Sequence, residues 1–188
     1  MTEALCQYRY EILHQADLLC TADQIQAALE RVAEKINKTL ATVNPLVLCV
    51  MRGGLVFTGQ LLTKLNFPLD LDYVHVTRYG GEQQGGGLRW IVPPNEMVQG
   101  RVVLIADDIL DEGHTLAALK QRVLALGATH CYSAVLVDKL HGRIKPIQAD
   151  FVGLNLPDRF VFGYGMDIEG AWRNLPAIYA LKQSIPES

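Results

Sequence analysis

Residues 102–116, VVLIADDILDEGHTL, have the pattern of a buried strand that passes into a helix. The run VVLIA is apolar throughout, as in a strand covered on both faces. TLAALKQRVLALG, residues 115–127, has helical spacing and ends at a glycine suited to a helix C-terminus. A strand followed by a helix predicts one unit of a parallel sheet. Between the two stand three aspartates and a glutamate, which need a chemical explanation.

The same alternation of strands and helices continues on both sides of this unit. Thr21 and Gln24 have the spacing of a capping box, and apolar residues then recur at helical spacing up to Leu40. The other expected elements are strands at 45–51, 70–76 and 131–138 and a helix at 55–65. The sequence therefore predicts an α/β fold with a mostly parallel twisted sheet flanked by helices.

Two regions interrupt this alternation. From Thr77 to Arg101 the chain is rich in glycine and has no period, which predicts a functional lid or a disordered linker, because structureless loops longer than about 12 to 15 residues are uncommon in compact domains. After Pro146, DFVGLNL and RFVFGYGM are two closely spaced strand-like segments, followed by a short helical tail around 176–181. We expect these segments to form a small subregion over the sheet, within a single domain that spans residues 1–188.

Composition and charge argue against several classes of protein. A formal net charge of −3 without a Lys/Arg cluster argues against a nucleic-acid binder. No apolar run approaches the roughly 18 residues of a membrane span, and the first twenty residues lack the pattern of an export signal. The four cysteines have no C-x-x-C spacing, which predicts free thiols. We expect a soluble, cytoplasmic protein.

The turn from Asp111 to Thr115 has the chemistry of an anion site. Ligands of open α/β sheets bind beyond the carboxyl ends of the strands, where N–H groups at a helix N-terminus point outward. Gly113 allows a close approach of the backbone, so the turn predicts a cradle for a phosphate. Its spacing is that of neither the P-loop nor the dinucleotide fingerprint, which argues against a triphosphatase and a dehydrogenase.

Asp107 and Asp108 need a different role, because carboxylates repel phosphate. They are good acceptors for paired hydroxyls and good ligands for Mg²⁺, directly or through water. A phosphorylated sugar with vicinal hydroxyls would satisfy both halves of the stretch. The helix dipole also favours acidic residues in the first turn, but it does not explain two aspartates that directly follow a buried strand.

The stretch VVLIADDILDEGHTL resembles the phosphoribosyl pyrophosphate signature of type I phosphoribosyltransferases, specifically that of the hypoxanthine-guanine phosphoribosyltransferases. The resemblance extends from about Leu46 to Arg173. It implies that family's fold, with a purine-binding hood made of the N-terminal segment and roughly residues 150–188. The further matching motifs are VMRGG at 50–54, VTRYGG at 76–81, LVDKL at 136–140 and DFVGLNLPDRFVFGYGMD at 150–167.

The resemblance implies roles for five residues at a purine base, among them Asp167 in the purine-binding segment. Asp111 would be the catalytic acid/base, acting at N7, and Lys139 would bind the 6-oxo group. Phe160 would stack on the base, and Val161 would contact its edge through the backbone. Taken alone, Lys139 could equally be a surface lysine, and Phe160 would more often be a core residue.

The resemblance also implies a site for phosphoribosyl pyrophosphate and Mg²⁺. Asp107 and Asp108 would face the ribose and one metal ion, and Asp167 would lie near a second. Arg52 and Gly53 would contact pyrophosphate through an unusual backbone geometry, although Arg52 could instead only cap a helix. The implied phosphoribosyl pyrophosphate site comprises Arg52, Gly53, Tyr79, Asp107, Asp108, Asp111, Glu112, Gly113, His114, Thr115 and Arg173.

Three features depart from the family's pattern. Glu112 stands where many relatives have Ser or Thr, so a hydroxyl contact to the 5′-phosphate is missing and Glu112 should point outward. The acidic pair is Asp-Asp rather than Glu-Asp, which shortens the first carboxylate and favours contact with Mg²⁺ through water. The expected lid, GGEQQGGG at 80–87, lacks the usual Ser-Thr pair.

The resemblance implies transfer of the 5-phosphoribosyl group to N9 of hypoxanthine, guanine or possibly xanthine, in a purine salvage enzyme that forms a homodimer or homotetramer. Two alternatives remain. A regulator of the same fold would sense phosphoribosyl pyrophosphate and bind nucleic acid, but it would be expected to have a basic face. A transferase for a pyrimidine or adenine is disfavoured by Lys139 and the segment from Phe160 to Asp167.

Overall fold

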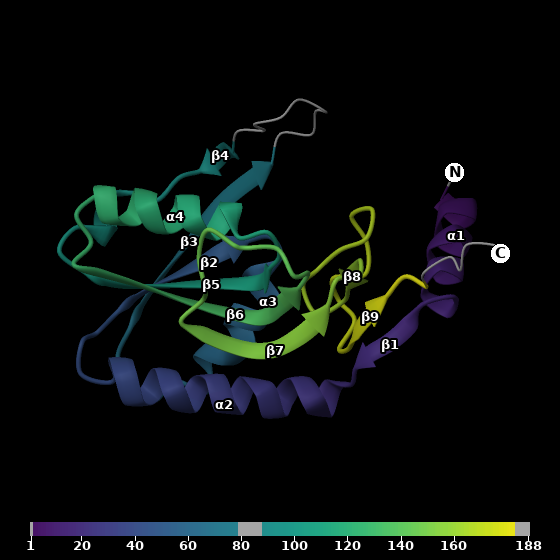
Figure 1. The fold of residues 1–188 in the computed structure, drawn as a ribbon, viewed down its shortest axis with the longest axis horizontal. Coiled ribbons are helices and arrows are strands. Elements are labelled where there is room, and N and C mark those ends of the chain that lie inside the picture. Colours follow the sequence, from purple (N-terminus) through teal and green to yellow (C-terminus); the bar gives the residue numbers. More distant parts are fainter. Residues whose placement is uncertain (1, 79–87, 183–188) are drawn as a thin grey trace.

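The computed structural model describes residues 2–78 and 88–182, and its main element is a six-stranded sheet in the order β4-β3-β2-β5-β6-β7 (Figure 1). The pairs β3–β2, β2–β5, β5–β6 and β6–β7 are parallel, and β4 is antiparallel to β3. The predicted mostly parallel sheet is thus confirmed. The strands are β2 (Leu46–Met51), β3 (Asp70–Arg78), β4 (Leu88–Val92), β5 (Val102–Leu110), β6 (His130–Leu140) and β7 (Phe151–Pro157).

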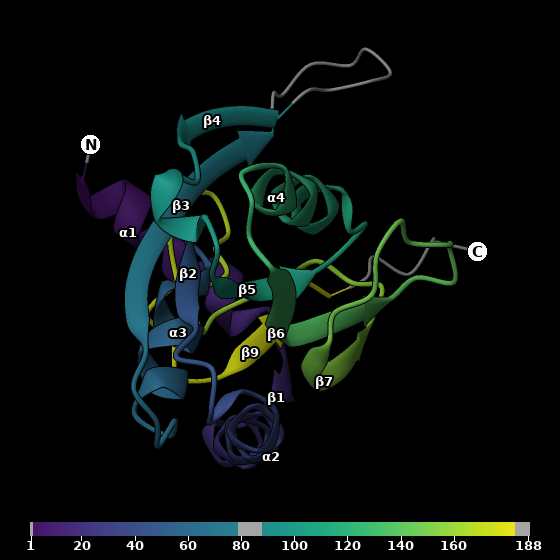
Figure 2. The same ribbon diagram turned by 90° about the vertical axis from the view of Figure 1, so that its left-hand side faces the viewer.

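Helices cover both faces of this sheet, as predicted. α2 (Ala22–Leu40) and α3 (Gly54–Leu62) pack on one face, and α4 (His114–Ala125) packs on the other (Figures 1 and 2). Neighbouring residues of β5 point to opposite faces, so Leu104 joins the core with α2 and α3 while Val103 joins the core with α4. The continuous apolar run VVLIA therefore reflects a strand with two covered faces.

The predicted helix ends are also confirmed. The Thr21 hydroxyl accepts a hydrogen bond of 3.3 Å from the Gln24 N–H, and the Gln24 side chain accepts one of 2.9 Å from the Thr21 N–H. Gly127 follows α4 with a φ of 91°, the left-handed conformation typical of a glycine after a helix. Local sequence signals thus determine where α2 begins and α4 ends.

A second, three-stranded sheet lies beyond the ends of β6 and β7 (Figure 1). It consists of β1 (Asp17–Cys20), β9 (Ile178–Ala180) and β8 (Val161–Phe162), and α1 (Thr2–His14) precedes β1. The sequence did not predict α1 or β1. The helical tail expected around 176–181 is wrong, because buried Ile178 and Ala180 alternate with partly exposed Tyr179, which is the spacing of a strand.

Two other expectations are wrong at the edges of the large sheet. DFVGLNL forms β7, which pairs with β6 and packs against α2, so it belongs to the large sheet rather than to a separate subregion. The region from Thr77 to Arg101 contains β4, whose Leu88 and Trp90 pack on the core beside α4, and a short 3₁₀ helix, Glu96–Val98. Glycines and prolines around β4 hide its alternation in the sequence.

Candidate active site

Asp107 and Asp108 lie inside the central strand β5, not after it as the sequence suggested. The strand continues to Leu110 because its parallel pairing with β6 extends to Asp138. Each of the two aspartates is only 8% exposed. Both line a cavity of about 280 Å³ at the carboxyl end of β5, where an open α/β sheet is expected to bind its ligand.

Burial disfavours the charged form of both carboxylates. Burial raises the pKa of Asp107 well above its ordinary value, and the neighbouring Asp108 charge raises it further. Burial also raises the pKa of Asp108, although its hydrogen bond with Asp107 and the positive charge of Arg173 oppose the rise. The Asp108 N–H donates to Asp107 Oδ1 at 2.9 Å. A cation placed at this pair would relieve the repulsion between the carboxylates.

The predicted anion turn lies next to the pair. Asp111, Glu112 and Gly113 form the turn, and α4 begins directly at His114. Gly113 adopts a φ of 85° and provides no side-chain cap for the helix. The first N–H groups of a helix have no partner within it, so they are available to an anion. Asp111, Gly113 and Thr115 line the cavity, whereas the His114 side chain is exposed.

The loop after β2 approaches the aspartate pair from the other side. The peptide bond between Met51 and Arg52 is cis, so the backbone there is unusual. Gly53 lines the cavity and packs so closely on Asp108 that an added Cβ would lie 1.8 Å from Asp108 Oδ2. Gly53 also occupies the N-cap position of α3, so Arg52 is not the capping residue, and its side chain is exposed.

The segment that connects β8 to β9 contributes Arg173 to the lining of the cavity. The Arg173 guanidinium lines the cavity, donates to Gly165 O at 2.6 Å and pairs with the Asp167 carboxylate. Asp167 also accepts a hydrogen bond of 2.7 Å from the Gly170 N–H. Within residues 2–78 and 88–182, no three His, Cys, Asp or Glu side chains gather around one ion site, so Asp167 does not complete a site with the aspartate pair.

Lys139 and Val161, two of the residues expected at a purine, belong to β6 and β8, and Phe160 directly precedes β8. Lys139 is 9% exposed at the end of β6 and donates to Asp111 Oδ2 at 3.0 Å, so the surface-lysine alternative is wrong. Phe160 is 54% exposed, which rules out the core alternative for this residue. Val161 directly follows it as a buried residue of β8. Tyr79 and the expected lid at 80–87 lie outside the described residues.

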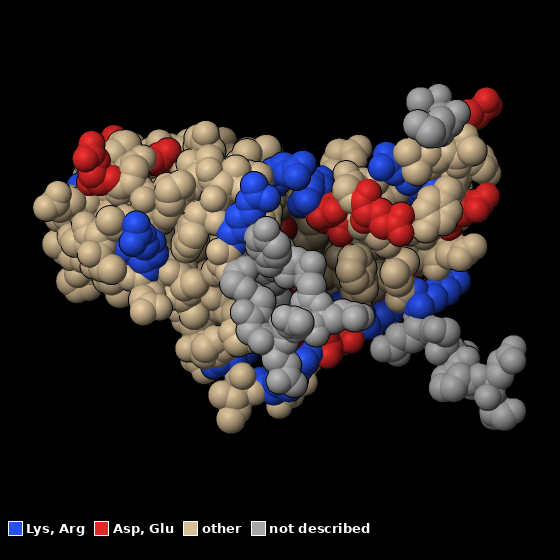
Figure 3. Space-filling view, turned by 90° about the horizontal axis from the view of Figure 1, so that it is seen from above, with Lys and Arg blue, Asp and Glu red and all other residues tan. Residues whose placement is uncertain are grey.

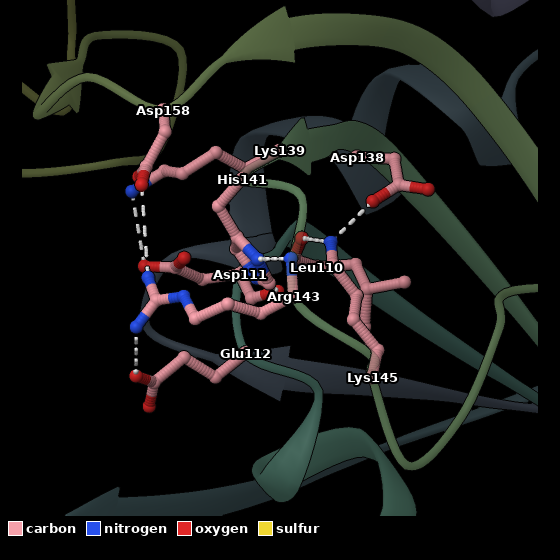
Figure 4. A network of polar contacts seen from close by, with 9 residues as sticks. All are labelled: Leu110, Asp111, Glu112, Asp138, Lys139, His141, Arg143, Lys145 and Asp158. Carbon is pink, nitrogen blue, oxygen red and sulfur yellow. Dashed lines mark hydrogen bonds and ion pairs between the residues drawn. The ribbon is translucent and has the colours of Figure 1, made fainter.

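The sequence analysis did not identify a set of basic residues that contact the anion turn and Leu110 just before it (Figure 4). In KLHGRIK, residues 139–145, every second residue is basic, and this spacing was the available signal. The Lys145 ammonium donates to Leu110 O at 2.7 Å, and His141 Nε2 lies 3.1 Å from Asp111 O. Arg143 lies 3.6 Å from Glu112, whose side chain is 39% exposed and is not among those that line the cavity, which is consistent with the expected outward orientation.

Comparisons with known proteins identify the family of this chain. Residues 21–169 match the family model of the phosphoribosyl transferase domain. The chain is 34% identical to the hypoxanthine-guanine phosphoribosyltransferase of Lactococcus lactis, over 89% of this chain and 92% of the relative. It is also 34% identical to that of Bacillus subtilis, over 91% of this chain and 96% of the relative.

Solved structures lead to the same family. A hypoxanthine phosphoribosyltransferase from Staphylococcus aureus superposes with a TM-score of 0.81 at 28% identity, over 88% of this chain and 91% of that one. A variant of the hypoxanthine phosphoribosyltransferase from Trypanosoma cruzi, in a ternary complex with substrates, has a TM-score of 0.81 at 33% identity. The match covers 90% of this chain and 97% of that one. The family match, the identity to whole relatives and the shared fold together place this chain in the phosphoribosyltransferase family, among the hypoxanthine-guanine phosphoribosyltransferases.

Proposed function

We propose that this protein is a purine salvage enzyme that transfers the 5-phosphoribosyl group of phosphoribosyl pyrophosphate to N9 of a 6-oxopurine, giving IMP or GMP and pyrophosphate. The contact of 3.0 Å between Lys139 and Asp111, beside the anion turn, carries this proposal. A lysine ammonium donates to a 6-oxo oxygen, and a carboxyl group can exchange a proton with N7. Adenine would instead present an amino group, a second donor, to Lys139.

The reaction needs orientation and charge neutralisation more than covalent help. Attack of N9 on C1′ would displace pyrophosphate with inversion, through a transition state with oxocarbenium character. The N–H groups at the start of α4, with Thr115, would hold the 5′-phosphate, and Arg173 would offset the charge of the leaving pyrophosphate. Asp111 would act as general acid/base at N7.

The donor set at the aspartate pair suits Mg²⁺, the cofactor that we propose. Mg²⁺ prefers oxygen ligands and is usually held by one or two carboxylates, with water and substrate oxygens completing its shell. Asp107 and Asp108 provide two buried carboxylates of raised pKa that a divalent cation would stabilise. When bound, the ion would neutralise charge on pyrophosphate. Asp167 would lie near a second ion, after release from Arg173.

The small sheet would serve as the hood over the base. Phe160 has an exposed ring that could stack on a purine, and the Val161 backbone could contact the purine edge. We infer that residues 1–188 form one domain, with this hood built from the N-terminal segment, β8 and β9.

The comparisons and the surface favour an enzyme over the nucleic-acid-binding regulator. The relatives and structures described above are all named as phosphoribosyltransferases. Figure 3 shows acidic as well as basic side chains gathered around a hollow, rather than a uniformly basic face. A nucleic-acid-binding surface would be expected to be basic. We therefore propose phosphoribosyl pyrophosphate and a purine base as the partners, and no nucleic acid.

A panel of bases tests the proposed function. The protein is incubated with Mg²⁺ and phosphoribosyl pyrophosphate, and with hypoxanthine, guanine, xanthine or adenine in separate reactions. We expect nucleotide from at least one 6-oxopurine and none from adenine. Failure of all three 6-oxopurines would contradict the proposal, and the relative rates would rank the substrates.

We also propose a homodimer or homotetramer that works in the cytoplasm. In the described part of the chain, no helix is long and apolar enough to span a membrane. Cys20, Cys49 and Cys131 are buried free thiols, which fits a reducing compartment. Light scattering coupled to gel filtration measures the mass in solution, and a monomeric mass would contradict the proposed assembly.

A further inference from the structure

Arg143 connects the anion turn to the segment that leads to Phe160, the residue proposed to stack on the base. One guanidinium nitrogen lies 3.6 Å from Glu112 Oε1, and the other lies 3.6 Å from Asp158 Oδ2 (Figure 4). Glu112 belongs to the turn before α4, and Asp158 precedes Phe160 by two residues. The Arg143 side chain is 62% exposed, so it reaches both carboxylates from the outside of the site.

The backbone that carries Arg143 is fixed to the same turn. The Arg143 N–H donates to His141 Nδ1 at 3.2 Å, which makes Nδ1 an acceptor. In a neutral imidazole the proton is then on Nε2, which donates to Asp111 O at 3.1 Å. Gly142 between them has a φ of 70°, which turns the chain sharply. His141 therefore joins the backbone of Arg143 to that of Asp111.

The negative charge of Glu112 disfavours the binding of a phosphate at the anion turn. Its carboxylate belongs to the same short turn whose N–H groups would hold a 5′-phosphate dianion, and like charges repel. At a partly exposed site this repulsion is screened but not abolished. The cation of Arg143, placed at the Glu112 carboxylate, reduces the negative charge that the phosphate meets.

We propose that Arg143 is a positioning residue that neutralises Glu112 and so permits this turn to bind the 5′-phosphate. The inference rests on the proposed function, because it concerns the same phosphate site. It assigns to Arg143 the task of offsetting the negative charge that Glu112 brings to the turn. Arg143 acts through Glu112 and not as a direct phosphate ligand.

A double-mutant cycle of Arg143→Gln and Glu112→Gln separates these roles. We measure the Kd of IMP by calorimetry for the wild type, both single variants and the double variant. Arg143→Gln should weaken IMP binding about three- to tenfold, the range expected for one partly screened charge. Glu112→Gln should bind IMP at least as well as the wild type, and the double variant should return to within about twofold of it.

Two controls locate the effect. Arg122→Gln removes an arginine from the last turn of α4, and it should leave the Kd of IMP unchanged. The KM of pyrophosphate, which lacks the 5′-phosphate, should change little in Arg143→Gln during the reverse reaction. The loss in Arg143→Gln should also shrink as salt is raised.

The outcomes distinguish this inference from the proposed function. Equal loss of IMP affinity in Arg143→Gln and in the double variant would mean that Arg143 contacts phosphate directly or is only structural, and would overturn the inference. Weaker binding by Glu112→Gln would overturn it as well. Binding of IMP without any nucleotide formation would contradict the proposed function alone, and a wild type that does not bind IMP would contradict both.

Discussion

The Lys139 ammonium lies 3.0 Å from the Asp111 carboxylate, so the two side chains proposed to contact a purine at its 6-oxo group and at N7 are bonded to each other. Lys139 is nearly covered, whereas the Asp111 side chain is 39% exposed. The Asp111 carboxylate thus gives the buried Lys139 ammonium a charged hydrogen-bond partner when no base is bound. A bound base would have to share or replace this contact.

Lys139→Gln tests the base-binding role. The variant retains a donor but loses the charge, and hydrogen bonds to charged groups contribute about 1.5–3 kcal/mol. We expect the KM of hypoxanthine to rise roughly 10- to 100-fold, while the KM of phosphoribosyl pyrophosphate changes much less. Steady-state kinetics with each substrate varied in turn measures both. A rise confined to phosphoribosyl pyrophosphate would show that Lys139 does not contact the base.

Asp111→Asn tests proton transfer. An amide keeps the shape of the carboxyl group but cannot act as an acid/base at N7, and such catalysis typically contributes about 10²- to 10⁴-fold. We expect kcat to fall by that order, whereas the affinity for phosphoribosyl pyrophosphate changes only slightly. Single-turnover rates and calorimetry separate the two effects. Equal losses in rate and affinity would leave Asp111 with a binding role only.

Gly53→Ala tests the close approach of the first loop to the aspartate pair. The new Cβ would lie 1.8 Å from Asp108 Oδ2, so the carboxylate or the loop must move. We expect a loss of activity and a loss of stability of about 1–3 kcal/mol, as for other overpacked sites. The matched control is Gly59→Ala within α3, where an added Cβ meets nothing within 4 Å.

The control should change stability in the opposite direction. Alanine in a helix interior is more favourable than glycine by roughly 0.5–1 kcal/mol, so Gly59→Ala should be slightly more stable and fully active. Urea unfolding followed by circular dichroism measures both variants. If Gly53→Ala kept wild-type activity and stability, the loop would not be tightly packed against Asp108.

Asp107→Asn tests the electrostatic strain at the pair in metal-free protein. The raised pKa of Asp107 means that the folded state binds a proton more tightly than the unfolded state, whose ordinary value is 3.8. The free energy of unfolding should therefore fall as pH rises from 3.8 through the raised folded pKa. The variant lacks this titration, so with chelator present it should be more stable than the wild type at neutral pH, by at least about 1 kcal/mol.

Thermal unfolding across that pH range, with and without Mg²⁺, measures the effect. Mg²⁺ should stabilise the wild type more than Asp107→Asn, because the variant has lost one proposed ligand. A wild type whose stability does not depend on Mg²⁺ at millimolar concentrations would argue against the proposed metal site.

The sequence predicts the sheet well because its strongest signals are local. The apolar run of β5, the capping box at Thr21 and the glycine after α4 each determine structure within a few residues. The short strands of the small sheet depend on partners far along the chain. β1 pairs with β9 although about 160 residues separate them, so neither strand has a strong pattern of its own.

Sequence and structure differ in a similar way at the candidate site. The turn from Asp111 to Thr115 is contiguous, so its chemistry can be derived from the sequence alone. The contacts of Arg143 with Glu112 and Asp158 join three loops, and only the fold brings them together. The boundary error at Asp107 has the same origin, because pairing with β6 extends β5 beyond its apolar run.

The pairing of β1 with β9 has a consequence for how the protein matures on the ribosome. The anion turn lies within residues 102–116, beside strands that are already synthesised or soon follow, so the phosphate side can assemble early. The small sheet needs Ile178–Ala180 to pair with Asp17–Cys20, about 160 residues earlier in the sequence. A nascent chain would therefore gain its sugar-phosphate side first, and its purine side only after Ile178–Ala180 has emerged.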